Sequence, residues 1–194
     1  MYRNTVEIAG YARRFIGYPD ERELQDQAQL FHDFFDFHGP RPEIRRYTNL
    51  ATMASDVAEL IKELHENNGY PFSEIAILYT VKSAGTDNST SIPHLFSRTL
   101  EAKGILSTWV SEDSRSKHAY DITTNRVTIS TIHSAKGLDY ACVFLVGFDF
   151  LEPGKPWSEE EIRSLAYVGI TRARYRLFIS YMQETTIVNQ LIVL

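Results

Sequence analysis

Short apolar runs punctuate the chain and predict buried strands. Ile75–Tyr79 and Val127–Thr131 are rich in aliphatic and β-branched residues and are too short for helices. Further strands are predicted at residues 44–47, 106–110, 142–146 and 177–181. Most of these runs do not alternate between apolar and polar positions. Continuous apolar strands are typical of a parallel sheet that is covered on both faces.

Longer segments carry apolar residues at helical spacing. The first follows the cap candidates Asn4 and Thr5. Its apolar positions are Val6, Ala9, Ala12, Phe15 and Ile16. Further helices are predicted at residues 21–37 and 50–66, and between Ser91 and the breaker Gly104. Ser158 and Glu161 have the spacing of a capping box, which predicts a last helix with Leu165 and Val168 on its apolar face.

Strands and helices alternate along the whole chain. This order predicts one α/β domain with a mostly parallel sheet and helices on both faces. The polar segments 82–91 and 111–126 lack any apolar period and are predicted to be loops. Ligands of such sheets bind at the carboxyl ends of strands, so the segments after Val110, Thr131 and Val146 are the places where a site is expected.

Composition narrows the class of protein. The chain has 194 residues, of which 43% are hydrophobic and 23% charged, and these values fit one soluble globular domain. The single cysteine, Cys142, lies in an apolar run, which fits a buried thiol and a reducing cytoplasm. No apolar run reaches about 18 residues, so no membrane span is expected. The six histidines have no metal-ligand spacing.

Charge alone does not predict nucleic-acid binding. The net charge is −5, whereas a stand-alone nucleic-acid binder usually carries a basic excess. Basic residues cluster at 41–46 and 172–176, and on charge alone each cluster is interpreted as solvated surface.

Three segments carry a specific pattern. They are Tyr2-Arg3-Asn4-Thr5, then Thr-Ile-His-Ser-Ala-Lys-Gly-Leu-Asp at 131–139, and Leu-Ala-Tyr-Val-Gly-Ile-Thr-Arg-Ala-Arg at 165–174. In this order they resemble motifs IV, V and VI of UvrD/Rep-type helicases, with motif V spanning 127–139 and motif VI spanning 161–174. The resemblance covers nearly the whole chain. It implies the second, C-terminal RecA-like motor domain of a superfamily 1 DNA helicase.

The resemblance assigns a nucleotide site. Arg3 and Arg172 match the arginine fingers of motifs IV and VI, and phosphoryl transfer needs such cations on the developing phosphate charge. Tyr2 matches a tyrosine that stacks on adenine, and Gly137 falls within the nucleotide-binding motif. Asp139 stands where the family usually has glutamate, so its expected contact with the ribose hydroxyls is looser or bridged by water.

The same resemblance assigns contacts to DNA. Thr131, His133 and Ser134 follow a predicted strand end, where short polar side chains can hold phosphates of single-stranded DNA. Taken alone, a histidine such as His133 is more often a structural hydrogen-bonding residue. Lys136 could serve DNA, nucleotide or fold, and the sequence does not separate these roles.

Two features of the sequence suggest a missing half. No Gly-x-x-x-x-Gly-Lys-[Ser/Thr] phosphate loop occurs in the chain, and its first helical pattern begins abruptly. We therefore expect ATP to bind between this domain and an N-terminal RecA-like domain that supplies the Mg²⁺ ligands. The isolated chain is expected to be inactive. Residues 111–126 are expected to form a loop in place of the inserted domain that is common in the family.

Two alternatives stay open. The domain could drive a fused nuclease in a DNA-repair helicase–nuclease, or it could be a non-catalytic interaction module on the same fold. The motor hypothesis also makes a geometric prediction. Arg3, Arg172 and Asp139 should share one solvent-open face at the carboxyl edge of the sheet, and the two arginines should have no carboxylate partner.

Overall fold

The fold is built on a six-stranded sheet with the strand order β1-β8-β7-β2-β6-β5. The computed structural model describes residues 4–17, 37–84, 90–110, 124–151, 154 and 157–194. All paired strands of this sheet run parallel. The predicted class of fold, an α/β domain with a mostly parallel sheet and helices on both faces, is confirmed.

The central strands are fully buried and the outer ones are not. The strands are β1 (Glu43–Arg46), β2 (Ile75–Tyr79), β5 (Ser107–Val110), β6 (Val127–Thr131), β7 (Tyr140–Val146) and β8 (Ala173–Tyr181). Every residue of β2 and β7 is buried, as expected for strands that have a neighbour on each side and helices on both faces. The two predicted strands β2 and β6 have the expected bounds.

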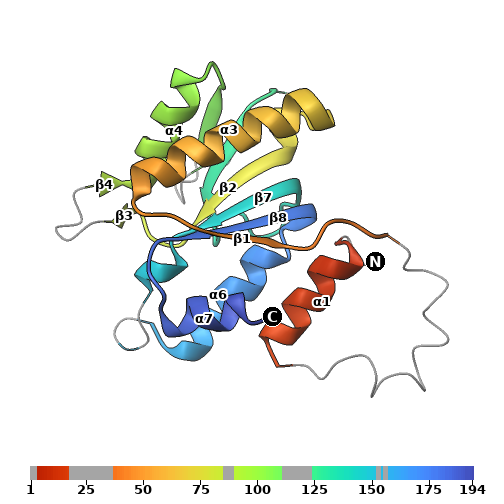
Figure 1. Ribbon diagram of the computed structural model, residues 1–194, viewed down its shortest axis with the longest axis vertical. Helices are drawn as coiled ribbons and strands as arrows, with labels where there is room; N and C mark the ends of the chain where they lie inside the picture. Colours follow the sequence, from red (N-terminus) through yellow and green to blue (C-terminus); the bar gives the residue numbers. More distant parts are fainter. Residues whose placement is uncertain (1–3, 18–36, 85–89, 111–123, 152–153, 155–156) are drawn as a thin grey trace.

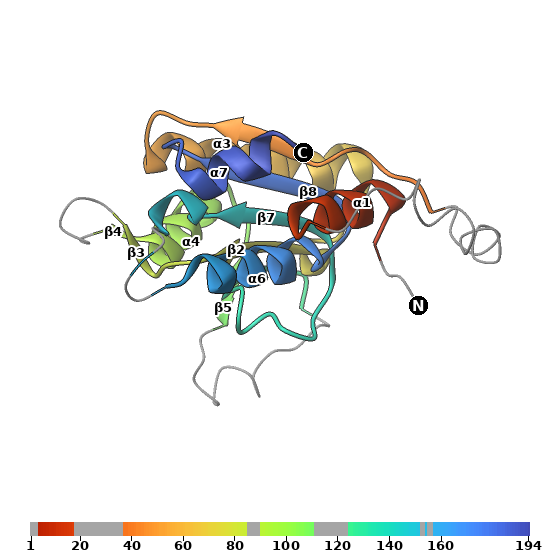
Figure 2. The same ribbon diagram turned by 90° about the horizontal axis from the view of Figure 1, so that it is seen from below.

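Helices cover both faces of the sheet. In Figure 1, α3 (Leu50–Asn68) and α4 (Ile92–Ala102) lie on one face, and α1 (Val6–Phe15), α6 (Glu159–Ile170) and α7 (Thr186–Ile192) lie on the other. Figure 2 shows the same two layers from below. Two 3-10 helices, η3 (Phe72–Glu74) and η4 (Phe148–Phe150), precede β2 and follow β7.

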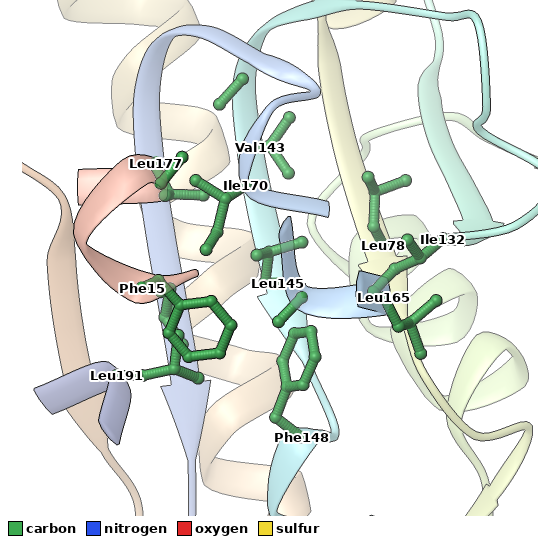
Figure 3. Close-up of a cluster of buried hydrophobic side chains, with 14 of the residues drawn as sticks. Phe15, Leu78, Ile132, Val143, Leu145, Phe148, Leu165, Ile170, Leu177 and Leu191 are labelled. Carbon is green, nitrogen blue, oxygen red and sulfur yellow. The ribbon is translucent and has the colours of Figure 1, made fainter. Parts of the chain in front are cut away.

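Two apolar clusters, one on each face, hold the layers together. Figure 3 shows the cluster between the sheet and helices α1, α6 and α7, in which Phe15, Leu165 and Leu191 pack toward Val143 and Leu145 of β7. The second cluster joins α3 and α4 to the opposite face of the strands. Neighbouring strand residues alternate between the clusters, since Leu145 belongs to the first and Phe144 to the second.

The helices begin and end where their capping residues predict. The side chain of Thr5 accepts from the backbone N–H of Ile8, and Ser158 and Glu161 form the predicted capping box of α6. Helix α3 ends at Gly69, which has φ +74°, a left-handed conformation that glycine adopts without strain.

Some predicted elements differ from the structure. Within 82–91, predicted to be a loop, Ser83–Ala84 (β3) and Thr90–Ser91 (β4) pair as short antiparallel strands. Strand β8 begins at Ala173, four residues before the predicted start, and helix α7 was not predicted. Most of the helix predicted at 21–37 and of the loop predicted at 111–126 lies outside the described residues.

Candidate functional site

Arg172 lies where helix α6 passes into strand β8. Its Nε donates to the carbonyl of Val168, 3.1 Å away, and its Nη1 donates to the carbonyl of Leu138 at 3.1 Å. Nη1 also lies 3.1 Å from Oδ1 of Asp139. The two side chains are 19% and 11% exposed, so this ion pair is largely shielded from water. The guanidinium is therefore held in one orientation by two backbone carbonyls and one carboxylate.

This pair stands at the amino ends of two neighbouring strands. Asp139 directly precedes β7 and Arg172 directly precedes β8, and the backbone N–H of Tyr140 donates to the carbonyl of Arg172 at 2.9 Å. Because β7 and β8 are parallel, both residues lie at the same edge of the sheet. The sequence prediction that they lie close together is confirmed.

Three parts of the geometric prediction are wrong. Arg172 has a carboxylate partner, Asp139, although the sequence predicted an unpaired arginine. The pair is largely shielded from water, although a solvent-open face was predicted. The pair also lies at the amino edge of the sheet rather than at the carboxyl edge. The reason is that residues 132–139 run from the carboxyl end of β6 to the amino end of β7, so Asp139 is a whole strand length away from Thr131.

Asn4 and Thr5 dock beside Arg172. The amide Nδ2 of Asn4 donates to the carbonyls of Thr171, at 3.0 Å, and Ala173, at 2.6 Å. The backbone N–H of Thr5 donates to the carbonyl of Arg174 at 2.9 Å. These bonds flank Arg172 on both sides and bring the described part of the predicted motif IV to motif VI. Tyr2 and Arg3 lie outside the described residues.

The predicted DNA-binding residues form a compact turn at the opposite, carboxyl edge. Oγ1 of Thr131 accepts from the backbone N–H of Ser134 at 3.0 Å and donates to its hydroxyl at the same distance. Ser134 is buried, whereas His133 and Lys136 are exposed. The ring of His133 lies 6.0 Å from that of Trp157, measured between centroids. The structure thus brings Thr131 and Ser134 together and leaves His133 facing solvent.

Gly137 has a conformational role. Its φ is +90°, which side-chain-bearing residues rarely adopt, and no atom lies within 4 Å of the position that a Cβ would occupy. The backbone turn, rather than a close neighbour in this chain, therefore explains the glycine.

The remaining arginines of the second basic cluster are paired. Arg174 bonds Glu74, and Nη2 of Arg176 lies 2.6 Å from Oε1 of Glu43. Arg45, in the first cluster, pairs with Glu43 and Asp56. Glu74 and Glu43 lie 100 and 133 residues from Arg174 and Arg176, so charge runs alone could not show these pairs.

Other predicted features can be checked directly. Cys142 is fully buried, so the prediction of a buried thiol is confirmed, and burial raises the pKa of this thiol to about 12. Among the described residues, no group of three or more His, Cys, Asp or Glu side chains could hold a metal ion. No helix in the described ranges is long and apolar enough to cross a membrane.

Comparisons with known proteins point to one family. Residues 104–184 match the model of the UvrD-like helicase C-terminal domain, and this range includes the segments at 131–139 and 165–174. ATP-dependent DNA helicase UvrD1 of Mycobacterium leprae is 30% identical in an alignment 192 residues long, which covers 92% of this chain and 23% of that protein. DNA helicase II of Haemophilus influenzae is 48% identical in an alignment 67 residues long, which covers 30% of this chain and 9% of that protein.

A solved structure supports the fold. The crystal structure of the C-terminal domain of a possible DNA helicase from Lactobacillus plantarum WCFS1 aligns with a TM-score of 0.57 at 13% identity, covering 98% of this chain and 93% of the other. The chain spans less than a quarter of the length of the two curated relatives, at 23% and 9%. From the family match, the relatives and the fold together, the chain is a C-terminal domain of the UvrD/Rep helicase family.

Proposed function

We propose that this chain is the C-terminal motor half of an ATP-dependent translocase on single-stranded DNA. The relatives named above are ATP-dependent DNA helicases or a DNA helicase II, and they are much longer than this chain. In this proposal ATP binds between this domain and an N-terminal RecA-like domain, which supplies the phosphate loop and the Mg²⁺ ligands. Single-stranded DNA crosses the carboxyl edge at Thr131, His133 and Ser134.

The orientation of Arg172 carries the proposal. Two backbone carbonyls fix the orientation of the guanidinium, and such preorganised cations stabilise the charge that develops in phosphoryl transfer. Arginine suits the role because it stays charged and offers five N–H donors in a planar fork. Arg3, one residue before the docked Asn4, is proposed as the second arginine of the same site.

In this proposal Asp139 contacts both Arg172 and the nucleotide. One of its oxygens already lies 3.1 Å from Arg172, so a ribose hydroxyl has to share the carboxylate with the guanidinium. An incoming phosphate likewise competes with Asp139 for the donors on Nη1. Nucleotide binding therefore exchanges part of an internal ion pair for contacts with the ligand. Closing of the cleft would be coupled to this exchange, and hydrolysis would reverse it.

The test is DNA-stimulated ATP hydrolysis by the protein in which this chain is joined to an N-terminal motor domain. We expect Arg172→Ala to lower kcat by about 10³-fold or more, with a much smaller change in nucleotide affinity. The matched control is Arg163→Ala on the preceding helix α6, because the side chain of Arg163 contacts Gln190 and Glu159 instead of the site. Normal turnover in Arg172→Ala would refute the proposal, as would an equal loss in both variants.

The gene region upstream of Tyr2 separates the motor from the interaction module. A phosphate loop encoded there supports a motor, and a coding region without one supports the module. A nuclease domain encoded in the same frame would favour the helicase–nuclease alternative.

A further inference from the structure

A tryptophan near the carboxyl edge of the sheet lies beside a lysine and a histidine. Trp109 lies on β5, the edge strand, and is only half-buried. Its Nε1 donates to the hydroxyl of Tyr79 at 2.9 Å, which fixes the plane of the ring. Nζ of Lys82 lies 5.2 Å from the centroid of the Trp109 ring. The centroids of the His94 and Trp109 rings are 5.1 Å apart, and the angle between the two ring planes is 69°. We call Tyr79, Lys82, His94 and Trp109 the Trp109 cluster.

The cluster adjoins the turn that was assigned to DNA. Tyr79 ends β2 beside Thr131 of β6, and the backbone N–H of Ile132 donates to the carbonyl of Tyr79. Trp109 pairs in register with Ile129 on the next strand, two residues before Thr131. Strand geometry therefore places the backbones of Trp109 and Thr131 about 8 Å apart. One short stretch of single-stranded DNA can reach both.

The charges around the ring favour an anionic ligand. Lys82 and His94 are both exposed. Within the ranges that the structure describes, no carboxylate lies at ion-pair distance from Lys82. His94 is in the first turn of α4, and Ser91, the cap residue of this helix, makes no capping bond with its side chain. The N-terminus of α4 thus adds partial positive charge beside the two side chains. In both views the β3–β4 ribbon lies beside this end of α4 (Figure 1, Figure 2).

Packing alone explains only part of this arrangement. Trp109 does contact the second apolar cluster, and its bond to Tyr79 would serve any well-packed indole. Packing does not require an exposed lysine over the ring in a chain whose net charge is −5. Aromatic rings beside a positively charged groove are the usual means of holding single-stranded nucleic acid without reading its sequence.

We propose that the Trp109 cluster is a site on which one base of single-stranded DNA stacks, next to the Thr131–Ser134 turn. The base takes the place of Lys82 over the indole, because an exposed cation–π contact is weak and exchanges readily. The ammonium of Lys82 then contacts the phosphate of the same nucleotide, and His94 lines the same site. The inference rests on the proposed function and deepens it by naming where a base is held.

Indole fluorescence gives the direct test. The chain has two tryptophans, so Trp157→Phe leaves Trp109 as its only indole and serves as the reference for the series. The reference protein is titrated with oligo(dT) at about 50 mM salt, where phosphate contacts are strong. We expect the emission to be quenched with the same midpoint that the anisotropy of labelled oligo(dT) reports. Anisotropy without quenching would overturn the inference and leave the proposed function standing.

Substitution of the ring gives an independent readout. Loss of one stacked base weakens binding by about tenfold, so Trp109→Leu should raise the Kd by that factor. Trp109→Phe keeps a stacking face and should bind within a few-fold of the reference. Far-ultraviolet circular dichroism and the thermal midpoint check that both variants fold. Equal Kd values for folded Leu and Phe variants would contradict stacking, and absence of any binding at low salt would also contradict the inference.

Salt dependence tests the lysine. Removing one phosphate contact to a single strand should lower the slope of log K against log salt by about 0.7. We therefore expect Lys82→Ala to have the lower slope. Lys62→Ala is the charge-matched control, because Lys62 lies on α3 and pairs with Glu66. Identical slopes for the two variants would refute a phosphate contact at Lys82.

Discussion

The Arg172–Asp139 pair should measurably stabilise the isolated domain. At 3.1 Å and an effective dielectric constant of about 20, the direct attraction is about 5 kcal/mol, and in bulk water it would be about 1 kcal/mol. Desolvation of both groups opposes this attraction. Since 19% and 11% of the two side chains remain exposed, we expect a net coupling of about 1–3 kcal/mol.

A double-mutant cycle measures this coupling. The variants are Asp139→Asn, Arg172→Gln and the double substitution, each compared with the wild-type domain by urea unfolding. Each single variant leaves one charge without its partner in a largely shielded place. The free energy of unfolding that it loses should therefore be more than half of what the double variant loses. A loss of 1–3 kcal/mol should lower the thermal midpoint of a domain of this size by about 2–12 °C. A coupling below about 0.5 kcal/mol would refute the view that the pair holds Arg172 in position.

Three further predictions concern other parts of the chain. Burial raises the pKa of Asp149, and its Oδ1 is buried without a hydrogen-bond partner. The free energy of unfolding of the wild type, relative to that of Asp149→Asn, should therefore fall as pH rises from about 4 through the raised pKa. Urea unfolding of both proteins between pH 4 and 7 checks this, and an increase with pH would contradict it. Gly169→Ala should cost about 1–3 kcal/mol, because its Cβ would meet Cδ2 of Leu145 at 3.0 Å and Cδ1 of Ile132 at 3.1 Å; an unchanged urea midpoint would show that these side chains yield freely. The isolated chain should show no ATPase activity with single-stranded DNA, since its sequence has no phosphate loop, and turnover that disappears in Arg172→Ala would contradict this.

Apolar runs predicted the centre of the sheet well and its margins less well. Strands β2 and β6 could be placed to the residue because burial on both faces requires uninterrupted apolar side chains. The first half of β8 was not predicted, because Arg174 and Arg176 interrupt the apolar run there. They are tolerated because Glu74 and Glu43, from distant segments, pair with them.

The buried face of the first helix was predicted only in part. Val6 is exposed, whereas Ile8 and Tyr11 are buried against the core. Tyr11 can lie inside because its hydroxyl donates to the carbonyl of Leu191 in α7, a helix that the sequence did not predict. A partner 180 residues away cannot be read from local periodicity.

The sequence named residues of the candidate site but did not predict how they are arranged. The motifs identified Asp139 and Arg172, but not their ion pair, because that contact depends on the pairing of β7 with β8. Assigning Asp139 to the end of β6 gave the wrong edge of the sheet. The Trp109 cluster carried no recognisable motif, since it forms from β2, β5, α4 and the segment after β2.

Catalysis and structure at Arg172 are separated most directly by Arg172→Lys in the protein that joins this chain to an N-terminal motor domain. Lysine keeps a cation that can pair with Asp139, but it lacks the planar fork of arginine. The measurement is kcat at saturating ATP and single-stranded DNA, taken together with the thermal midpoint. The account predicts a midpoint close to that of the wild type and a kcat lower by about a hundredfold or more. Wild-type turnover in a stably folded Arg172→Lys protein would contradict it.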